Sequence, residues 1–305
     1  MKTLITGALK YNKSELKKLE QIGLEIKYIK DETIRANMEF SDIEFIICNS
    51  FFLYNDIKLF KNLKYIQVTS AGMDRLPLKY IENKKIKVFN ARGVYSIPMA
   101  EWTILKILEI YKHSKKFYRN QEKHLWEKDR DILELNNKKA TILGYGSVGQ
   151  EIAKRLKAFG VYINAVDRKE MFDENIDRYY NISQINNILP ESDIVILTLP
   201  LTEETQYIIN SDRLKIMKDK SILVNISRGK IIKENDLLEI LETEKFLGVI
   251  LDVFENEPLD KTNKLWDYNN VIITPHNSFV SNNNEERLYN LIYKNILKIR
   301  MEKEQ

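Results

Sequence analysis

Residues 144–149 read Gly-Tyr-Gly-Ser-Val-Gly, which is the glycine spacing of a dinucleotide-binding turn. An apolar run at 140–143 precedes the turn, and a segment with helical spacing follows it. Gly144 permits a tight turn, Gly146 lets the backbone approach a diphosphate, and Gly149 lets the helix pack closely on the strand. The free N–H groups at the start of that helix would face the phosphate charge.

The next apolar run, residues 161–166, ends at Asp167. An acid at this point of a strand–turn–helix–strand unit binds the ribose hydroxyl groups of adenosine. A lone glycine turn would be weak evidence, but here the strands, the helix and the terminal acid occur together. Asp167 favours NAD over NADP because a carboxylate repels a 2′-phosphate, whereas the neighbouring Arg168 is suited to binding that phosphate.

Of the three histidines, only His276 follows a run of strand type, at residues 271–273. His113 and His124 lie among lysines and are predicted to be solvated. A histidine exchanges a proton near neutral pH, and a carboxylate beside it fixes its tautomer. Glu257 follows the preceding apolar run, so we expect it to pair with His276.

Two further polar segments follow apolar runs of strand length. Arg228 follows the run 222–226, and its planar guanidinium is suited to binding a carboxylate through two parallel hydrogen bonds. An ordinary surface arginine is the alternative, but a place on a nucleotide-binding sheet favours function. Residues 69–74 follow the run 63–68, and small residues there could form an anion-binding nest of backbone N–H groups. An ordinary strand–helix turn explains this segment equally well.

An arginine and a His–carboxylate pair beside a nicotinamide suit the oxidation of a 2-hydroxy acid. The arginine would orient the substrate and polarise its C2 oxygen. The histidine would take the hydroxyl proton while hydride leaves for the nicotinamide. Ligands of open parallel sheets bind beyond the carboxyl ends of the strands, which is where these residues are predicted to lie.

Apolar runs of strand length that alternate with helical segments predict an α/β protein with parallel sheets. The first part of the chain has five runs and no glycine motif, and the later part has about six, as a complete doubly wound dinucleotide fold requires. The runs are 4–6, 24–29, 45–48, 63–68 and 86–89, then 140–143, 161–166, 193–199, 222–226, 249–253 and 271–273.

Ser14 is predicted to cap a first helix that ends at Gly23. Ser96 is predicted to be the N-cap of a long helix with Pro98 in its first turn. That helix is apolar on most sides, which indicates burial at the junction of two domains. Residues 282–300 have one apolar face, so a terminal helix is expected to pack on the first domain.

The composition is that of a globular protein. The chain of 305 residues is long enough for two domains and is 44% hydrophobic and 30% charged. A net charge of +4, with no basic stripe interleaved with aromatics, argues against nucleic acid as a partner. No apolar segment predicts a signal peptide or a membrane span, so we expect a cytoplasmic protein. The single cysteine, Cys48, is predicted to pack in a core.

The order of these motifs resembles the D-isomer-specific 2-hydroxyacid dehydrogenase family, and the resemblance spans most of the chain. Its most specific pieces are Ser-Ala-Gly-Met-Asp at 70–74, the glycine turn at 144–149, Leu-Pro-Leu-Thr-Glu-Glu-Thr at 199–205, Asn-Ile-Ser-Arg-Gly at 225–229, Asp-Val-Phe-Glu-Asn-Glu-Pro at 252–258 and Thr-Pro-His at 274–276.

The resemblance implies that Arg228 binds substrate, that Glu257 supports the base and that His276 is the acid/base. It also implies that the backbone of Ser70, Ala71 and Gly72 binds the substrate carboxylate. Met99, Pro200, Ile226 and Asp252 would line the cofactor near the nicotinamide. The other implied cofactor contacts are Gly144, Tyr145, Gly146, Ser147, Val148, Gly149, Asp167, Arg168, Leu199, Thr205, Ser227, Arg228 and His276.

The resemblance further implies two doubly wound parallel-sheet domains. A flavodoxin-like catalytic domain would comprise residues 1–95 and 282–305, and a Rossmann NAD-binding domain would comprise residues 96–281. Closure around the substrate and a homodimer are implied as well, and no metal site is expected. Asn277 and Ser278 replace the small or apolar pair that usually follows the histidine, which bears on the local pocket.

Three functions fit these features. The first is the NAD-dependent interconversion of a small D-2-hydroxy acid and its 2-oxo acid. The second is an NAD(H)-sensing, corepressor-like regulator, because such relatives can retain the same catalytic residues. The third is an NADP-linked glyoxylate or hydroxypyruvate reductase. The substrate side chain is not identified, although the aromatic residues within 50–54 and the segment after Asp74 are candidates for its pocket or for the core.

Overall fold

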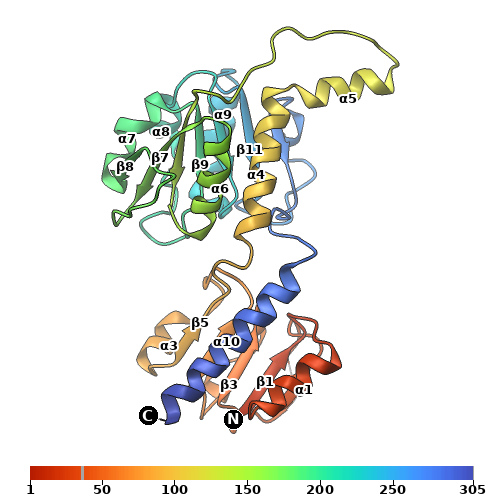
Figure 1. Ribbon diagram of the computed structural model, residues 1–305, viewed down its shortest axis with the longest axis vertical. Helices are drawn as coiled ribbons and strands as arrows, with labels where there is room; N and C mark the ends of the chain where they lie inside the picture. Colours follow the sequence, from red (N-terminus) through yellow and green to blue (C-terminus); the bar gives the residue numbers. More distant parts are fainter. Residues whose placement is uncertain (36–37, 305) are drawn as a thin grey trace. The chain divides into compact units, whose positions relative to one another are not determined.

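The computed structural model describes residues 1–35 and 38–304, which form two compact units. The first unit comprises Met1–Tyr95 and the C-terminal segment from Ser281, and the second comprises Ser96–Val280. Each contains one parallel sheet with helices on both faces, as the α/β prediction required (Figure 1). Within the described residues, no helix is long and apolar enough to cross a membrane.

The first unit contains a five-stranded sheet in the order β2-β1-β3-β4-β5, and all neighbouring strands are parallel. This is the flavodoxin-like order. Each apolar run predicted in this part of the chain contains a strand. The strands are β1 (Lys2–Thr6), β2 (Glu25–Ile29), β3 (Phe45–Cys48), β4 (Tyr65–Val68) and β5 (Lys87–Phe89). Cys48 is buried in β3 as predicted, and burial raises the pKa of its thiol well above the ordinary value.

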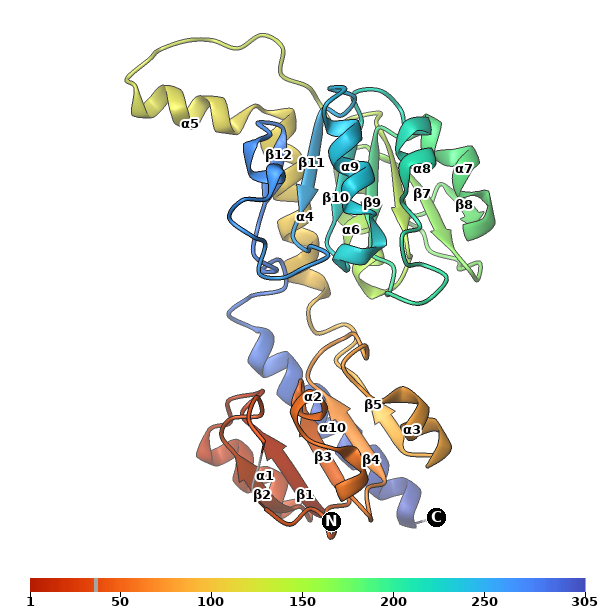
Figure 2. The same cartoon turned by 180° about the vertical axis from the view of Figure 1, so that it is seen from behind.

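Helices cover both faces of this sheet. On one face α1 and α10 pack on β1 and β3 through residues such as Leu19 and Ile292, and on the other α2, η1 and α3 enclose a second apolar cluster around Phe51 (Figure 2). The helical elements are α1 (Lys13–Gln21), α2 (Phe51–Tyr54), η1 (Ile57–Leu59), α3 (Leu78–Asn83) and α10 (Asn284–Glu304).

The predicted cap of α1 was wrong, because Asn12 caps this helix in place of Ser14. The Asn12 side chain accepts a hydrogen bond from the Glu15 N–H at 2.9 Å, and the Glu15 carboxylate accepts one from the Asn12 N–H at 2.8 Å. This reciprocal capping box satisfies two backbone donors, which a cap at Ser14 would not do.

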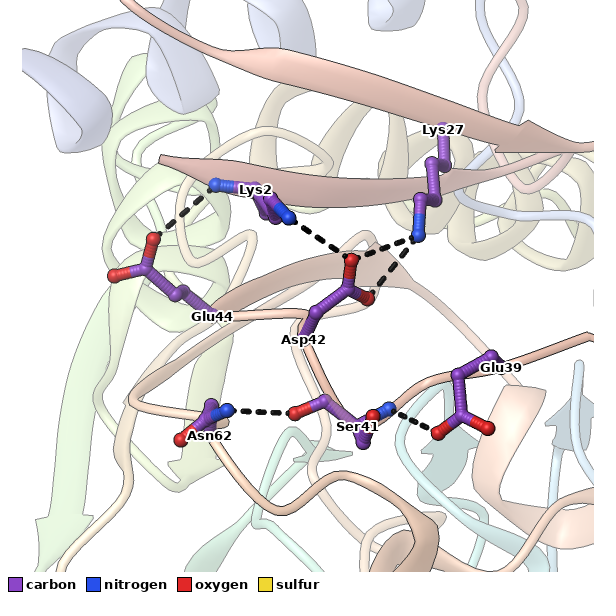
Figure 3. Close-up of polar contacts among 7 residues, drawn as sticks. All are labelled: Lys2, Lys27, Glu39, Ser41, Asp42, Glu44 and Asn62. Carbon is purple, nitrogen blue, oxygen red and sulfur yellow. Dashed lines mark hydrogen bonds and ion pairs between the residues drawn. The ribbon is translucent and has the colours of Figure 1, made fainter.

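Charged side chains join the amino ends of the strands in the first unit, as Figure 3 shows. The Nζ atoms of Lys2 and Lys27 lie 3.2 and 3.1 Å from the carboxylate of Asp42, and these hydrogen bonds lower the pKa of Asp42. Asn62 donates to the carbonyl oxygen of Ser41 at 2.8 Å. The contacts tie β1, β2 and the entry to β3 together at the edge opposite the carboxyl ends.

The second unit contains a seven-stranded parallel sheet in the order β12-β11-β10-β9-β6-β7-β8. The strand order reverses between β6 and β9, and ligands of such sheets bind beyond the strand ends at this point of reversal. The strands are β6 (Lys139–Leu143), β7 (Tyr162–Asp167), β8 (Arg178–Asn181), β9 (Ile194–Leu197), β10 (Ile222–Asn225), β11 (Gly248–Leu251) and β12 (Val271–Ile273).

The sheet has one strand more than predicted, because β8 carries no apolar run. Its sequence Arg-Tyr-Tyr-Asn belongs to an edge strand with exposed ends, so neither burial nor alternation marks it. The other six predicted runs each contain a strand.

Figure 1 shows α4 and α6 on one face of the second sheet, and Figure 2 shows α8 and α9 on the other. The predicted N-cap at Ser96 was wrong, because Ser96 is the first residue of α4 and its buried hydroxyl has no hydrogen-bond partner in the described part of the chain. The helical elements are α4 (Ser96–Tyr111), α5 (Ser114–Glu122), α6 (Ser147–Ala158), η2 (Ile182–Gln184), α7 (Ile185–Ile188), η3 (Leu189–Glu191), α8 (Ser211–Ile216), η4 (Gly229–Ile231), α9 (Glu234–Leu241) and η5 (Lys264–Asp267).

A carboxylate in the segment after α5 contacts the start of that helix. The prediction that His113 is simply solvated was therefore wrong. The Asp129 carboxylate lies 3.0 Å from Nδ1 of His113 and 2.9 Å from Nζ of Lys116. Its side chain is only 5% exposed, and these two hydrogen bonds lower the pKa of Asp129. His124 is exposed, as expected.

Candidate active site

The glycine turn after β6 has the geometry that a diphosphate requires. Gly144 has φ +96°, and a Cβ there would lie 2.8 Å from the backbone nitrogen of Leu199. A Cβ on Gly149 would lie 2.7 Å from the Gly144 carbonyl oxygen, so the start of α6 approaches the turn only because no side chain is present. A Cβ on Gly146 would meet no atom within 4 Å, so the turn opens onto free space at this point. The residues therefore fit a dinucleotide whose diphosphate lies against Gly146.

Asp167 lies beside this turn at the end of β7. One carboxylate oxygen accepts a hydrogen bond from the Tyr145 N–H at 2.8 Å, and the other accepts one from the Arg168 N–H at 2.7 Å. The Tyr145 side chain is fully buried, which leaves only its backbone facing the turn. The Arg168 side chain is 72% exposed, and its guanidinium lies 4.0 Å from the carboxylate of Glu204.

The other residues expected to contact the cofactor come from the same unit. Most of them follow the carboxyl end of a strand, and the remainder lie in the first turn of a helix. Ser147 and Val148 begin α6, Met99 lies in the first turn of α4, Leu199, Pro200 and Thr205 follow β9, Ile226 and Ser227 follow β10, and Asp252 follows β11.

Arg228 lies in a turn that its neighbours hold tightly. Its guanidinium donates to the Ser227 carbonyl oxygen at 2.7 Å, and the buried Asn225 side chain donates to the Arg228 carbonyl oxygen at 2.9 Å. A Cβ on Gly229 would lie 1.8 Å from the carbonyl carbon of Phe254. The Arg228 turn therefore packs directly on the backbone of the segment that follows β11.

His276 and Glu257 form the predicted contact. The Nδ1 atom of His276 lies 2.8 Å from a Glu257 carboxylate oxygen, and the Phe254 N–H donates to the other oxygen at 3.1 Å. Burial alone would raise the pKa of Glu257, but these two hydrogen bonds and the charges of His276 and Arg228 outweigh it and lower that pKa. An ionised Glu257 holds a proton on Nδ1 of His276, which leaves Nε2 to exchange a proton with a ligand.

Asp252 holds the turn that carries His276, a role that sequence reasoning missed. Its fully buried carboxylate accepts hydrogen bonds from the Thr274 hydroxyl, the Asn277 N–H at 2.8 Å and the Ser278 N–H at 2.9 Å. Its carbonyl oxygen accepts one from the His276 N–H at 2.8 Å. These contacts keep His276 at φ +51°, a left-handed conformation uncommon for a residue with a side chain.

Sequence reasoning also missed Phe279. Its ring meets the His276 imidazole edge to face, with the ring centroids 5.9 Å apart and the planes at 88°. The contact adds an apolar support for the imidazole besides the Glu257 hydrogen bond. Its position three residues after the histidine was the only available signal.

In the first unit, residues 70–72 form a turn with free backbone donors. The Ser70 hydroxyl donates to the Gly72 carbonyl oxygen at 2.8 Å, the Ala91 N–H donates to the Ser70 carbonyl oxygen at 2.9 Å, and the Asn90 side chain donates to the Ala71 carbonyl oxygen at 2.8 Å. Among the described residues, no acceptor binds the N–H groups of Ala71 and Gly72. Bound carbonyl groups and free N–H groups give this turn the pattern of an anion nest.

The aromatic segment after β3 divides between core and surface. Phe51 is fully buried and packs edge to face on Phe40 and Phe60. Leu53 and Tyr54 are exposed. Only the outer part of this segment can therefore contact a ligand.

The reversing strand order and the glycine turn define the second unit as a dinucleotide-binding domain of the Rossmann class. Residues 104–278 match the family model described as D-isomer specific 2-hydroxyacid dehydrogenase, NAD binding domain. The chain belongs to this family, and the family predicted from the sequence is confirmed.

Known relatives resemble most of the chain. A hydroxypyruvate reductase of Thermotoga maritima is 35% identical over 219 residues, which cover 71% of each chain. A glyoxylate reductase of Thermofilum pendens is 30% identical over 244 residues, 78% of this chain and 72% of that protein. The structure of a D-lactate dehydrogenase of Aquifex aeolicus, complexed with NAD and lactic acid, superposes with a TM-score of 0.79 at 26% identity and covers 98% of this chain and 96% of that one.

Proposed function

We propose that this protein is an NAD-dependent dehydrogenase that interconverts a small D-2-hydroxy acid and its 2-oxo acid. The hydrogen bond between His276 and Glu257 carries the proposal, because it prepares Nε2 of the imidazole for proton exchange. The names of the relatives, hydroxypyruvate reductase, glyoxylate reductase and D-lactate dehydrogenase, support this reaction class.

His276 moves the proton in the proposed reaction. In the oxidation, its Nε2 takes the proton of the C2 hydroxyl group, and Glu257 stabilises the imidazolium that forms. In the reduction, the imidazolium returns that proton to the C2 oxygen. The nicotinamide, when bound, supplies or accepts the hydride at C2.

The substrate carboxylate is bound by charge and by backbone donors in this proposal. The Arg228 guanidinium binds it and polarises the C2 oxygen. The free N–H groups of Ala71 and Gly72, together with Ser70, provide the second set of contacts. These assignments give residues 1–95 with the C-terminal helix the substrate-binding role and residues 96–280 the cofactor-binding role.

NAD is the proposed cofactor, and NADP is the less favoured one. Asp167 would accept hydrogen bonds from the ribose hydroxyl groups that a 2′-phosphate would replace. Arg168, the residue suited to that phosphate, lies near the carboxylate of Glu204. The remaining contacts named above, Met99, Leu199, Pro200, Thr205, Ile226 and Ser227 among them, would line the nucleotide.

Nicotinamide absorbance tests the proposal directly. Glyoxylate, hydroxypyruvate and pyruvate are each mixed with NADH or NADPH and the protein. We expect oxidation of NADH by at least one of these acids and slower oxidation of NADPH. If NADH binds tightly and none of the acids is reduced, the function becomes that of the NAD(H)-sensing regulator.

We also propose a homodimer in the cytoplasm, with a small 2-hydroxy or 2-oxo acid and no nucleic acid as its ligand. The segment from α5 to residue 135 exposes several large apolar side chains, among them Trp126, which is 98% exposed, and Tyr118. A second copy of the chain is the occupant expected for such a surface. Sedimentation velocity of the protein and of a Trp126→Ser variant tests this, because an unchanged monomer in both would exclude the dimer.

A further inference from the structure

Glu32 is a buried carboxylate at the carboxyl end of the five-stranded sheet, where it is only 8% exposed. It accepts hydrogen bonds from the Thr6 hydroxyl at 2.7 Å, the Asn49 N–H at 2.9 Å and the Ser50 N–H at 2.7 Å. In the described part of the chain, no lysine or arginine forms an ion pair with it. Burying an ionised carboxylate is costly unless donors replace water, and these three donors do so. The segment after β3 is thereby fixed to the end of β1.

The fixed Ser50 contacts an exposed arginine. The guanidinium of Arg75 donates to the Ser50 hydroxyl oxygen at 3.3 Å. Within the residues that the structure describes, no carboxylate forms an ion pair with Arg75, although Arg155 and Arg168 each have an acidic partner. The planar fork of Arg75 therefore retains donors suited to an incoming carboxylate.

Ser50 and the nest at residues 70–72 belong to the same edge of one sheet. β3 and β4 are neighbours, and the Thr69 N–H donates to the Cys48 carbonyl oxygen at 2.9 Å, so the ladder continues to the ends of both strands. Arg75 follows this nest by three residues. One edge thus carries two different anion-binding features, free backbone N–H groups and a guanidinium.

We propose that Arg75, supported by Ser50 and Glu32, is a specificity-determining residue that selects 2-oxo acids with a second carboxylate at the end of the side chain. The inference rests on the proposed function and adds the class of substrate. With the C1 carboxylate in the backbone nest, the distal carboxylate binds Arg75. A methyl or hydroxymethyl side chain leaves the guanidinium without an anion, so such acids gain nothing from Arg75.

A matched pair of substrates isolates this contact. 2-Oxoglutarate and its 5-methyl ester have the same carbon chain, but the ester carries no distal charge. We expect the wild-type protein to prefer the acid by about tenfold to hundredfold in kcat/KM, the range of a hydrogen bond to a charged group. Arg75→Gln is expected to bring this ratio close to unity. Arg75→Lys is expected to give a ratio between that of the wild type and unity, because a point charge lacks the planar fork of arginine.

Lys79→Gln is the matched control, because it removes one exposed positive charge from α3 of the same unit. It is expected to retain the wild-type ratio. Equal ratios in the wild type and in Arg75→Gln would overturn the proposal. Failure of the proposed function looks different, because then neither of these acids nor glyoxylate would be reduced by any variant.

Glu32 acts through Ser50 and Arg75, which makes it a positioning residue. Glu32→Gln replaces one acceptor oxygen by an NH₂ group, which only donates, so the side chain can no longer accept from both the Asn49 and the Ser50 N–H groups and Ser50 should shift. We expect the acid-to-ester ratio to fall in Glu32→Gln, and to fall no further when Glu32→Gln is added to Arg75→Gln. A merely structural role would lower both kcat/KM values together and leave their ratio unchanged. If Glu32→Gln does not fold, Ser50→Ala tests the same link.

Discussion

The carboxyl ends of the two sheets are built in the same way and serve different purposes. At each edge a buried carboxylate, Asp252 or Glu32, accepts three hydrogen bonds and has no lysine or arginine as an ion-pair partner among the described residues. Asp252 fixes the turn of His276, which can move a proton. Glu32 fixes Ser50, which contacts only the charge of Arg75. Under the two proposals above, the edge of the second sheet performs the chemistry and the edge of the first sheet selects the substrate.

The largest effect expected at the edge of the second sheet comes from His276→Ala. Loss of the proton-transfer group should lower kcat by about 10²–10⁴-fold. The affinity for NADH should change little, because the glycine turn and Asp167 are untouched. Stopped-flow turnover and a fluorescence titration with NADH measure the two quantities.

His113→Ala is the matched control for this change. His113 also pairs with a carboxylate, that of Asp129, but it lies between α4 and α5 and does not follow the carboxyl end of a strand. We expect its kcat to match the wild type. Near-normal turnover in His276→Ala would show that His276 does not transfer the proton. The two sheets would then no longer differ in the way proposed.

Arg228→Lys should produce the next largest effect. An ammonium group cannot form two parallel hydrogen bonds to a carboxylate, so kcat/KM should fall by about tenfold to hundredfold. Initial rates across substrate concentrations separate KM from kcat. Arg178→Lys on the edge strand β8 serves as the control, because that arginine lies over Tyr180 and away from the strand ends of β10 to β12. Unchanged constants would show that Arg228 is not the substrate clamp.

Asp252→Asn sharpens the comparison of the two buried acids. The amide would present an NH₂ group to a donor, so we expect a loss of about 1–3 kcal/mol in the free energy of unfolding. Because the turn of His276 loosens, kcat should fall by about tenfold. Urea unfolding and turnover measure these changes. A stability loss without a loss of kcat would make Asp252 a structural residue and remove its parallel with Glu32 as a positioning residue.

The positions of the candidate catalytic residues at strand ends were predictable from the sequence, whereas most of the residues that hold them in place were not. Arg228, Glu257 and His276 each follow an apolar run, and a parallel sheet brings such ends to one edge. The contacts of Asp252 and Glu32 join segments whose pairing depends on the folded sheet. The edge strand β8 and the capping box at Asn12 were missed because apolar periodicity does not report them.

The smallest expected effect is a shift in the pH dependence of 2-oxo acid reduction in Glu257→Gln. The pKa of Glu257 is lowered in the folded protein. Its contribution to stability is therefore present above the ordinary carboxyl pKa and is lost as the pH falls through the lowered value. Near neutral pH Glu257 is ionised, and a carboxylate beside an imidazole stabilises the charged form that gives a proton to the 2-oxo acid in the proposed reaction.

Without this charge, the rate of 2-oxo acid reduction should begin to fall at a lower pH, so the midpoint of that fall should lie below the wild-type midpoint. The rate of 2-oxo acid reduction across the pH range measures that midpoint. Asp129→Asn, which removes the partner of His113, is the control and should leave it in place. An equal midpoint in Glu257→Gln and the wild type would mean that the 2.8 Å contact to His276 orients the imidazole without stabilising its charge. Glu257 would then be a positioning residue in the second unit, as Glu32 is proposed to be in the first.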